Sequence, residues 1–271
     1  MAPQLRPSRH AYHAIVLAGQ AAVRLFRVRL LTSGEENLHR DRTVRAPTRA
    51  AVPGGGAVVA VTHFGYLDFV FAQLVVGRLL GAHCRFLITR KHTRSAFVTA
   101  VCRLCDHVVV DRANGAPAYA EALAKLRRGE LVAIFPEGGV SRSFTVRPLR
   151  TGAVRMAAET GAPIVPMSVW GGHRVLTRGR GRIRLRDVWG TPVRVHVGPV
   201  LRVGPDDDVV AASALLRAAL QAGIDRCVES YPATPPPGAW WMPAHLGGGA
   251  ITVAEQGEHD ERERQSYRRT G

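Results

Sequence analysis

The sequence predicts an α/β fold: a single mixed, largely parallel sheet flanked by helices. Short apolar runs rich in β-branched residues alternate with longer helical segments between residues 57 and 170. Polar residues suited to chemistry follow directly after several of these runs, where ligands gather in such sheets. With 46% hydrophobic residues in 271, the chain can bury a core of this kind.

The expected elements follow one another in a regular order. Strands are expected at residues 57–61, 84–89, 107–110, 131–135 and 163–170. Helices are expected at residues 69–80, 95–105, 116–128, 151–160 and 209–231. Three aspartates at 206–208 mark the start of the last helix, because acidic side chains suit the positive end of a helix dipole. The segment 174–203 is rich in Val, Arg and Gly and predicts two or three further strands.

An amphipathic helix is expected near the beginning of the chain, within residues 12–31. Its apolar stripe consists of Ile15, Gly19, Ala22, Val23, Phe26 and Leu30. Arginines interrupt the apolar run well short of the ~18 residues that a membrane span requires. Such a helix either lies on a membrane surface or covers the core, and the sequence leaves both possibilities open.

These patterns divide the chain into three parts. Residues 1–33 hold the basic, amphipathic segment, and residues 34–231 form the main α/β domain. Residues 232–271 begin with a stretch rich in Pro, Gly and Trp. They end in a charged, weakly apolar tail that we expect to be disordered.

The charge balance points to an anionic partner. The formal net charge is +16 and the isoelectric point is near 11.2. Nucleic acid, anionic lipid headgroups and an acidic carrier protein all fit this charge. No helix-turn-helix, zinc-finger or ribonucleoprotein motif is evident, so no nucleic acid partner is expected.

The four cysteines are too few for a disulfide framework in a chain of this length, which favours a reducing compartment. Cys102 and Cys105, with His92 and His107 nearby, have the spacing of half a zinc site. Because no second pair follows and one face of a helix gives the same spacing, no metal is expected.

The stretch with the most chemical content joins the first expected strand to the helix after it. His63 follows that strand, and Asp68 stands at the start of the helix. Gly65 permits an irregular turn that lets the carboxylate fold back onto the imidazole. A histidine held at one ring nitrogen can accept a proton at the other. The alternative is an N-capping aspartate beside an incidental histidine.

Four blocks occur in order along the chain. They are HFGYLD at 63–68, HVVVDR at 107–112, FPEGGVSR at 135–142 and APIVPM at 162–167. Together they resemble the glycerolipid acyltransferase family, specifically the bacterial 1-acyl-sn-glycerol-3-phosphate acyltransferases, over about residues 34–171. The sequence departs from the family at three positions: Thr62 replaces the usual Asn or Ser, Asp106 a common Gly, and Gly139 a frequent Thr.

The resemblance implies a direct transfer mechanism. His63 would act as the general base and Asp68 would orient it, while the acceptor alcohol attacks a thioester without a serine or cysteine nucleophile. Acyl-CoA or an acidic acyl carrier protein would be the donor, with no further cofactor. The acceptor would be lysophosphatidic acid or a related glycerophosphate, glycerol 3-phosphate being the alternative.

The family's remaining functional positions fall on basic and glycine-rich blocks. Arg112 matches the phosphate-binding arginine, and Glu137 with Gly138 matches the acceptor-binding surface. Arg142 and Arg150 are further candidate phosphate contacts. Each has a plain structural alternative: an ion pair of Arg112 with Asp111, or a turn carboxylate at Glu137.

The resemblance also implies a place in the cell. The protein would work peripherally at the cytoplasmic face of an anionic membrane, where its lipid acceptor lies. Two other classes remain open from the sequence. One is a non-catalytic protein that binds anionic lipid or a carrier on the same fold, and the other is a nucleic-acid binder suggested by charge alone.

Overall fold

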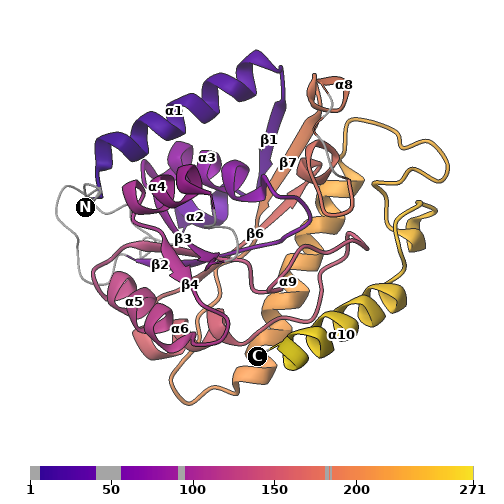
Figure 1. Ribbon diagram of the computed structural model, residues 1–271. Coiled ribbons are helices and arrows are strands. Elements are labelled where there is room, and N and C mark those ends of the chain that lie inside the picture. Colours follow the sequence, from indigo (N-terminus) through magenta and orange to yellow (C-terminus); the bar gives the residue numbers. More distant parts are fainter. Residues whose placement is uncertain (1–6, 41–55, 91–94, 181–182, 184, 271) are drawn as a thin grey trace.

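The computed structural model describes residues 7–40, 56–90, 95–180, 183 and 185–270 (Figure 1). Within these residues seven strands form one sheet, in the order β1-β7-β6-β2-β5-β3-β4. The strands are β1 (Arg29–Ser33), β2 (Ala57–Val61), β3 (Cys84–Thr89), β4 (Val108–Val110), β5 (Leu131–Ile134), β6 (Ile164–Trp170) and β7 (Pro192–Val197).

The direction of the strands gives the sheet one functional edge. Strands β6, β2, β5, β3 and β4 are mutually parallel, so their carboxyl ends meet along one edge. Strand β7 runs antiparallel to β6, and β1 runs parallel to β7. The expected mixed, largely parallel sheet is therefore confirmed.

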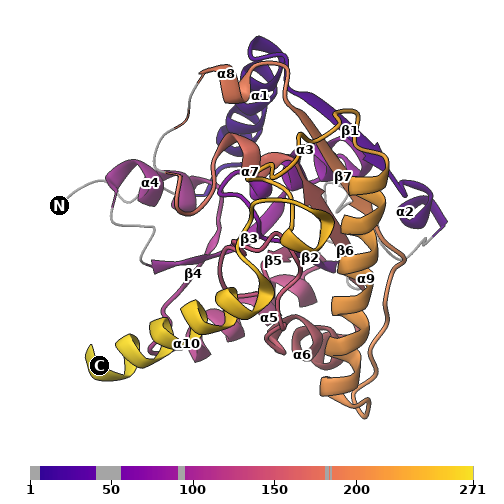
Figure 2. The same cartoon turned by 90° about the vertical axis from the view of Figure 1, so that its right-hand side faces the viewer.

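Helices cover both faces of the sheet (Figures 1 and 2). They are α1 (Arg9–Leu25), α2 (Glu36–Arg40), α3 (Asp68–Leu80), α4 (Ala96–Leu104), α5 (Ala116–Arg127), α6 (Gly152–Thr160), α7 (Gly172–Val175), α8 (Leu185–Val188), α9 (Val209–Glu229) and α10 (Val253–Thr270). The five strands expected between residues 57 and 170 and the five helices expected between residues 69 and 231 are all present, with ends that move by two residues or fewer.

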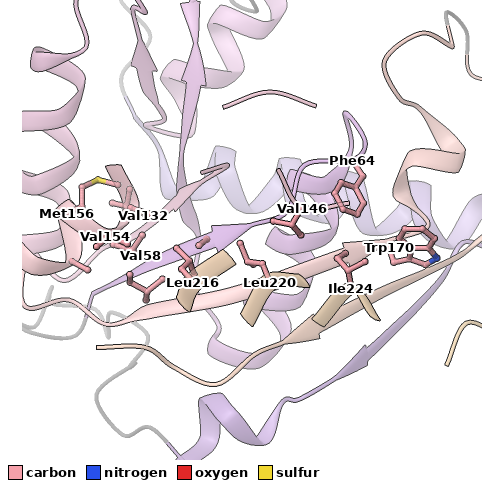
Figure 3. Close-up of a cluster of buried hydrophobic side chains, with 14 of the residues drawn as sticks. Val58, Phe64, Val132, Val146, Val154, Met156, Trp170, Leu216, Leu220 and Ile224 are labelled. Carbon is pink, nitrogen blue, oxygen red and sulfur yellow. The ribbon is translucent and has the colours of Figure 1, made fainter. Parts of the chain in front are cut away.

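The central strand β2 shows how the two cores are divided. Its residues are buried throughout and alternate between the two faces, as strand geometry requires. Val59 belongs to the core under α3, whereas Val58 belongs to the core under α6 and α9. Figure 3 shows the second core, in which side chains of α9 form a row along the sheet. The β-branched, unbroken apolar sequence of β2 is typical of a strand covered on both sides.

The amphipathic helix near the beginning of the chain covers the core. Tyr12 and Val16 of α1 are buried, and Ile15 and Val23 pack with them. The Tyr12 hydroxyl donates a hydrogen bond to the carbonyl oxygen of Cys84, 2.5 Å away. Part of the expected stripe is not helical, because the chain turns at Arg27 and enters strand β1. That strand pairs with β7, so residues 29–33 are part of the sheet.

The expectation for residues 174–203 is wrong. The described part of this segment contributes the single strand β7, together with the short helices α7 and α8. Gly171 adopts a φ of 93°, which ends β6 and turns the chain into α7. A left-handed residue of this kind is easy for glycine and interrupts an extended run.

The disorder expected for the charged tail is also wrong. Residues Val253–Thr270 form α10, which lies on the outside of the molecule, facing the viewer in Figure 2. Its start is a capping box: the N–H of Glu255 donates to Thr252 Oγ1, and the N–H of Thr252 donates to Glu255 Oε2. Because α10 is held by polar side chains rather than an apolar face, hydrophobic periodicity does not reveal it.

Candidate active site

His63 and Asp68 lie at the carboxyl end of β2, one on each side of the turn into α3. The carboxylate oxygen Oδ2 of Asp68 is 3.7 Å from Nδ1 of His63, an electrostatic contact rather than a hydrogen bond. The Asp68 side chain is fully buried, whereas that of His63 is 17% exposed. One ring edge therefore faces a buried negative charge while part of the ring reaches the surface.

Asp68 also builds the turn on which His63 stands. Its Oδ2 accepts hydrogen bonds from the backbone N–H groups of Phe64 and Gly65, each 2.7 Å long. Burial raises the pKa of Asp68, against the opposing effects of His63 and these two N–H groups. The carboxylate thus forms its hydrogen bonds within the turn, whereas its contact with the imidazole is electrostatic.

The His63 ring is held in place by an aromatic neighbour. It stacks on Phe135, which directly follows β5, with ring centroids 4.0 Å apart and planes 21° apart. Strands β2 and β5 are neighbours in the sheet, so this contact depends on their register. The stacking limits rotation of the imidazole about its side-chain bonds.

The segment after β6 forms a wall behind the turn. The Leu176 carbonyl accepts the backbone N–H of Tyr66 at 2.9 Å, and Thr177 Oγ1 donates to the Phe64 carbonyl at 2.5 Å. Gly172 faces the turn directly, since a Cβ there would lie 2.7 Å from Asp68 Oδ1. Sequence reasoning missed this wall, although the pair Gly171-Gly172 after an apolar strand is a signal for a close backbone approach.

Glu137 is hydrogen-bonded to the backbone of His63. Its Oε1 accepts the N–H of His63 at 2.7 Å, and its Oε2 accepts the N–H of Arg147 at 3.1 Å. The side chain is 3% exposed. Burial raises the pKa of Glu137 to about 8, although both N–H donors act in the opposite direction. The N–H of Ser141 donates to the His63 carbonyl at 2.8 Å, so this loop holds both sides of the His63 backbone.

Two of the predicted arginines meet at Gly138. Arg112 Nη2 donates to the Gly138 carbonyl at 2.8 Å. The Arg150 side chain lies against the other side of this residue, since a Cβ on Gly138 would be 2.4 Å from Arg150 Nε. Arg142 lies further along the same loop, directly after Ser141. The structure therefore places all seven predicted site residues around the carboxyl ends of β2 and β5 and the loop that follows β5.

Each departure from the family pattern has a local structural setting. Thr62 is buried, and its hydroxyl oxygen accepts the N–H of Val169 in neighbouring strand β6. Asp106 has a φ of 56°, the left-handed conformation that glycine adopts most easily. Gly139 faces a guanidinium, since a Cβ there would lie 2.9 Å from Arg147 Nη1.

The four cysteines are free and buried. Cys102 and Cys105 are buried in and beside α4, and burial raises the pKa of the Cys105 thiol to about 11. In the part of the chain that the structure describes, no cluster of three or more His, Cys, Asp or Glu side chains could hold a metal ion. His92, named with the sequence pattern, falls outside the described residues.

Comparisons with known proteins agree with the fold and identify a family. The family model described as Acyltransferase matches residues 29–170, more than half of the chain. A 1-acyl-sn-glycerol-3-phosphate acyltransferase of Borreliella burgdorferi is 30% identical over 125 residues, which cover 44% of this chain and 48% of that protein. One of Bacillus subtilis is 30% identical over 132 residues, covering 47% and 64%. The matches thus span about half to two thirds of these relatives.

A solved structure extends the likeness beyond the matched region. The crystal structure of the 1-acyl-sn-glycerophosphate (LPA) acyltransferase from Thermotoga maritima superposes with a TM-score of 0.60 at 19% identity. It covers 82% of this chain and 81% of that one. At this identity the likeness establishes a shared fold.

The burial of Glu137 makes stability depend on pH. A carboxyl with a folded pKa of about 8 and an ordinary unfolded value near 4.5 binds more protons when folded between these limits. Its contribution to stability is complete below pH 4.5 and is lost as the pH rises toward 8, by at most about 1.4 kcal/mol per pH unit. We expect the stability advantage of the wild type over Glu137→Gln to shrink across this window, as measured by urea unfolding at several pH values. Glu258→Gln, on the exposed surface of α10, is the control. An advantage that stays constant or grows with pH would mean that Glu137 is ionised throughout in the folded protein.

Proposed function

The chain belongs to the acyltransferase family, and we propose that it transfers a fatty acyl group from a thioester donor to a hydroxyl of lysophosphatidic acid. A closely related glycerophosphate lipid fits the same chemistry. The observation that carries the proposal is the partly exposed His63 beside the buried Asp68, with arginines gathered around the neighbouring Gly138. This arrangement combines a base with a cationic site for a phosphate.

The proposed reaction uses His63 as a general base. The imidazole takes the proton of the acceptor hydroxyl while the hydroxyl oxygen attacks the thioester carbonyl carbon. The tetrahedral intermediate then collapses, the carbon–sulfur bond breaks, and the thiolate takes the proton from the imidazolium. Asp68 stabilises the imidazolium between these steps, because its charge is buried close to Nδ1.

Arginines supply the site for the acceptor phosphate in this proposal. Arg112 and Arg150 flank Gly138, within the loop that contacts the His63 backbone. A guanidinium can bind two phosphate oxygens at once, which fixes orientation as well as affinity. The names of the similar proteins favour a lysophosphatidate acceptor over glycerol 3-phosphate.

We further propose that the enzyme works at the surface of an anionic membrane on its cytoplasmic side, with acyl-CoA or an acidic acyl carrier protein as donor. Among the residues that the structure describes, no helix has the length and apolar character to cross a bilayer. The net charge of +16 suits anionic headgroups and an acidic carrier alike. The four cysteines are free thiols, which suits a reducing compartment.

Replacing the base tests the chemistry. We expect His63→Ala to lower kcat by at least about a hundredfold, because general-base catalysis contributes factors of this size. The rate at which the donor thiol is released, with lysophosphatidic acid as the acceptor, measures kcat. His245→Ala, an exposed histidine far along the chain, serves as the control. Near-normal turnover in a folded His63→Ala protein would remove the mechanism.

Replacing an arginine separates binding from chemistry. We expect Arg112→Ala to raise KM for a phosphate-bearing acceptor by about tenfold with little change in kcat, because the contact is made in the ground state and the transition state alike. Steady-state kinetics with varied acceptor measure this effect. Arg155→Ala, on the exposed face of α6, is the matched control. A fall in kcat at constant acceptor KM would assign Arg112 a different role.

Membrane binding is expected to depend on charge. Each Lys or Arg close to an anionic surface contributes about 1 kcal/mol, and salt screens this attraction. In co-sedimentation we therefore expect more protein on vesicles with anionic lipid than on zwitterionic ones, and less on the anionic vesicles as salt rises. Equal binding to the two vesicle types at low salt would contradict the electrostatic part of the proposal.

A further inference from the structure

Helix α10 contacts the loop that carries the arginines of the site. Gln256, in the first turns of α10, accepts the backbone N–H of Arg142 through its Oε1 at 2.7 Å. Gln256 is 3% exposed, although most of the other side chains of α10 whose burial is described are exposed. A buried amide that loses its partner is destabilising, so this contact holds the loop and the helix together.

A second contact lies one turn further along α10. Asp260 Oδ2 is 2.5 Å from Arg147 Nη2, and both side chains are 16% exposed. The other oxygen of Asp260 accepts a hydrogen bond from Gln256 Nε2 at 2.8 Å. Gln256 and Asp260 are therefore hydrogen-bonded to each other, and together they hold the loop at Arg142 and Arg147.

Each of the two contacts of α10 is connected to His63 through one intervening residue. Arg142 follows Ser141, whose N–H donates to the His63 carbonyl. Arg147 donates its backbone N–H to Glu137, and Glu137 accepts the N–H of His63. The same short loop is thus fixed to the catalytic turn on its inner side and to α10 on its outer side.

The Arg147 guanidinium fills the space beside Gly139. A Cβ at position 139 would lie 2.9 Å from Arg147 Nη1. The missing side chain at 139 and the ion pair to Asp260 are therefore parts of one arrangement. Arg147 is the cation that α10 places against the Gly138-Gly139 segment, next to the residue that Arg112 and Arg150 flank.

We propose that Gln256 and Asp260 are positioning residues for the acceptor site, and that Arg147 belongs to the group of arginines that attracts the acceptor phosphate. This inference rests on the proposed function, because it gives the arginine-bearing loop a role in binding. It assigns part of the acceptor affinity to a helix that lies beyond residues 29–170, the region matched to the family.

The test is a kinetic comparison in the 271-residue chain. Asp260→Asn removes the charge that orients Arg147 while nearly preserving side-chain volume. We expect KM for lysophosphatidic acid to rise about five- to tenfold, with kcat within about twofold and KM for the acyl donor unchanged. Glu258→Gln is the matched control, because it removes one negative charge from an exposed pair on the same helix. An unchanged or lower acceptor KM in Asp260→Asn would overturn the proposal.

A second variant reaches Arg147 from the other side without altering α10. Gly139→Ala places a methyl carbon 2.9 Å from Nη1 of Arg147, so the guanidinium has to shift, and we expect this variant to raise the acceptor KM as well. If both changes act through Arg147, the double variant raises KM no further than the larger single change. Independent, multiplicative effects would overturn the shared role. Should Asp260→Asn fail to fold, an unchanged acceptor KM in Gly139→Ala decides against the proposal.

The outcomes also separate this inference from the proposed function. A wild-type protein that transfers no acyl group to any glycerophosphate acceptor would defeat the function itself. An active wild type whose acceptor KM is insensitive to Asp260→Asn would defeat only the role of α10.

Discussion

The site depends on two buried acidic side chains that accept hydrogen bonds from backbone N–H groups. Oδ2 of Asp68 accepts two of them and closes the turn after His63, and Glu137 joins that turn to the loop after β5. Leaving a buried carboxyl without donors costs far more than an ordinary hydrogen bond is worth, so the backbone is drawn around both groups. The position of the imidazole is a consequence: His63 stands where these two sets of bonds meet. Glu137 consequently contacts the backbone of His63 from a buried position.

Periodicity in the sequence predicts the sheet and its covering helices because each of those elements buries an apolar face. The predicted elements between residues 57 and 170 are all present, and His63, the predicted base, lies two residues beyond the end of β2. The same reasoning fails for α7 and α10, since neither is defined by an apolar face. Helix α7 follows from a left-handed Gly171, and α10 from a capping box and two polar anchors. Polar contacts between segments far apart in the chain leave no periodic signal, so Gln256 and Asp260 could not be found before the fold was known.

The positions at which the chain departs from its family carry structural information. Asp106 has the left-handed backbone conformation that glycine adopts most easily, and its carboxylate lies 2.6 Å from the ammonium nitrogen of Lys125, a side chain that is 2% exposed. Asp106 thus supplies, together with Glu121, the negative charge that a buried lysine requires. At Gly139 no charge is added. Instead, the absence of a side chain leaves room for the Arg147 guanidinium. Each of these two positions lies beside a charged side chain from another part of the chain, Lys125 at Asp106 and Arg147 at Gly139.

Because β1 pairs with β7, this part of the sheet can form only late in the synthesis of the chain. Arg29 lies opposite Pro192, so the first strand to leave the ribosome has no neighbour in the sheet until the chain beyond residue 192 has emerged. At typical rates of synthesis of about 5–20 residues per second, the delay is roughly 8–30 s. During that interval the unpaired backbone of β1 is open to other nascent chains and to chaperones. Helix α1 can dock earlier, because its anchors Gln73 and Cys84 emerge first, and by docking it would keep the waiting strand close to the nascent sheet.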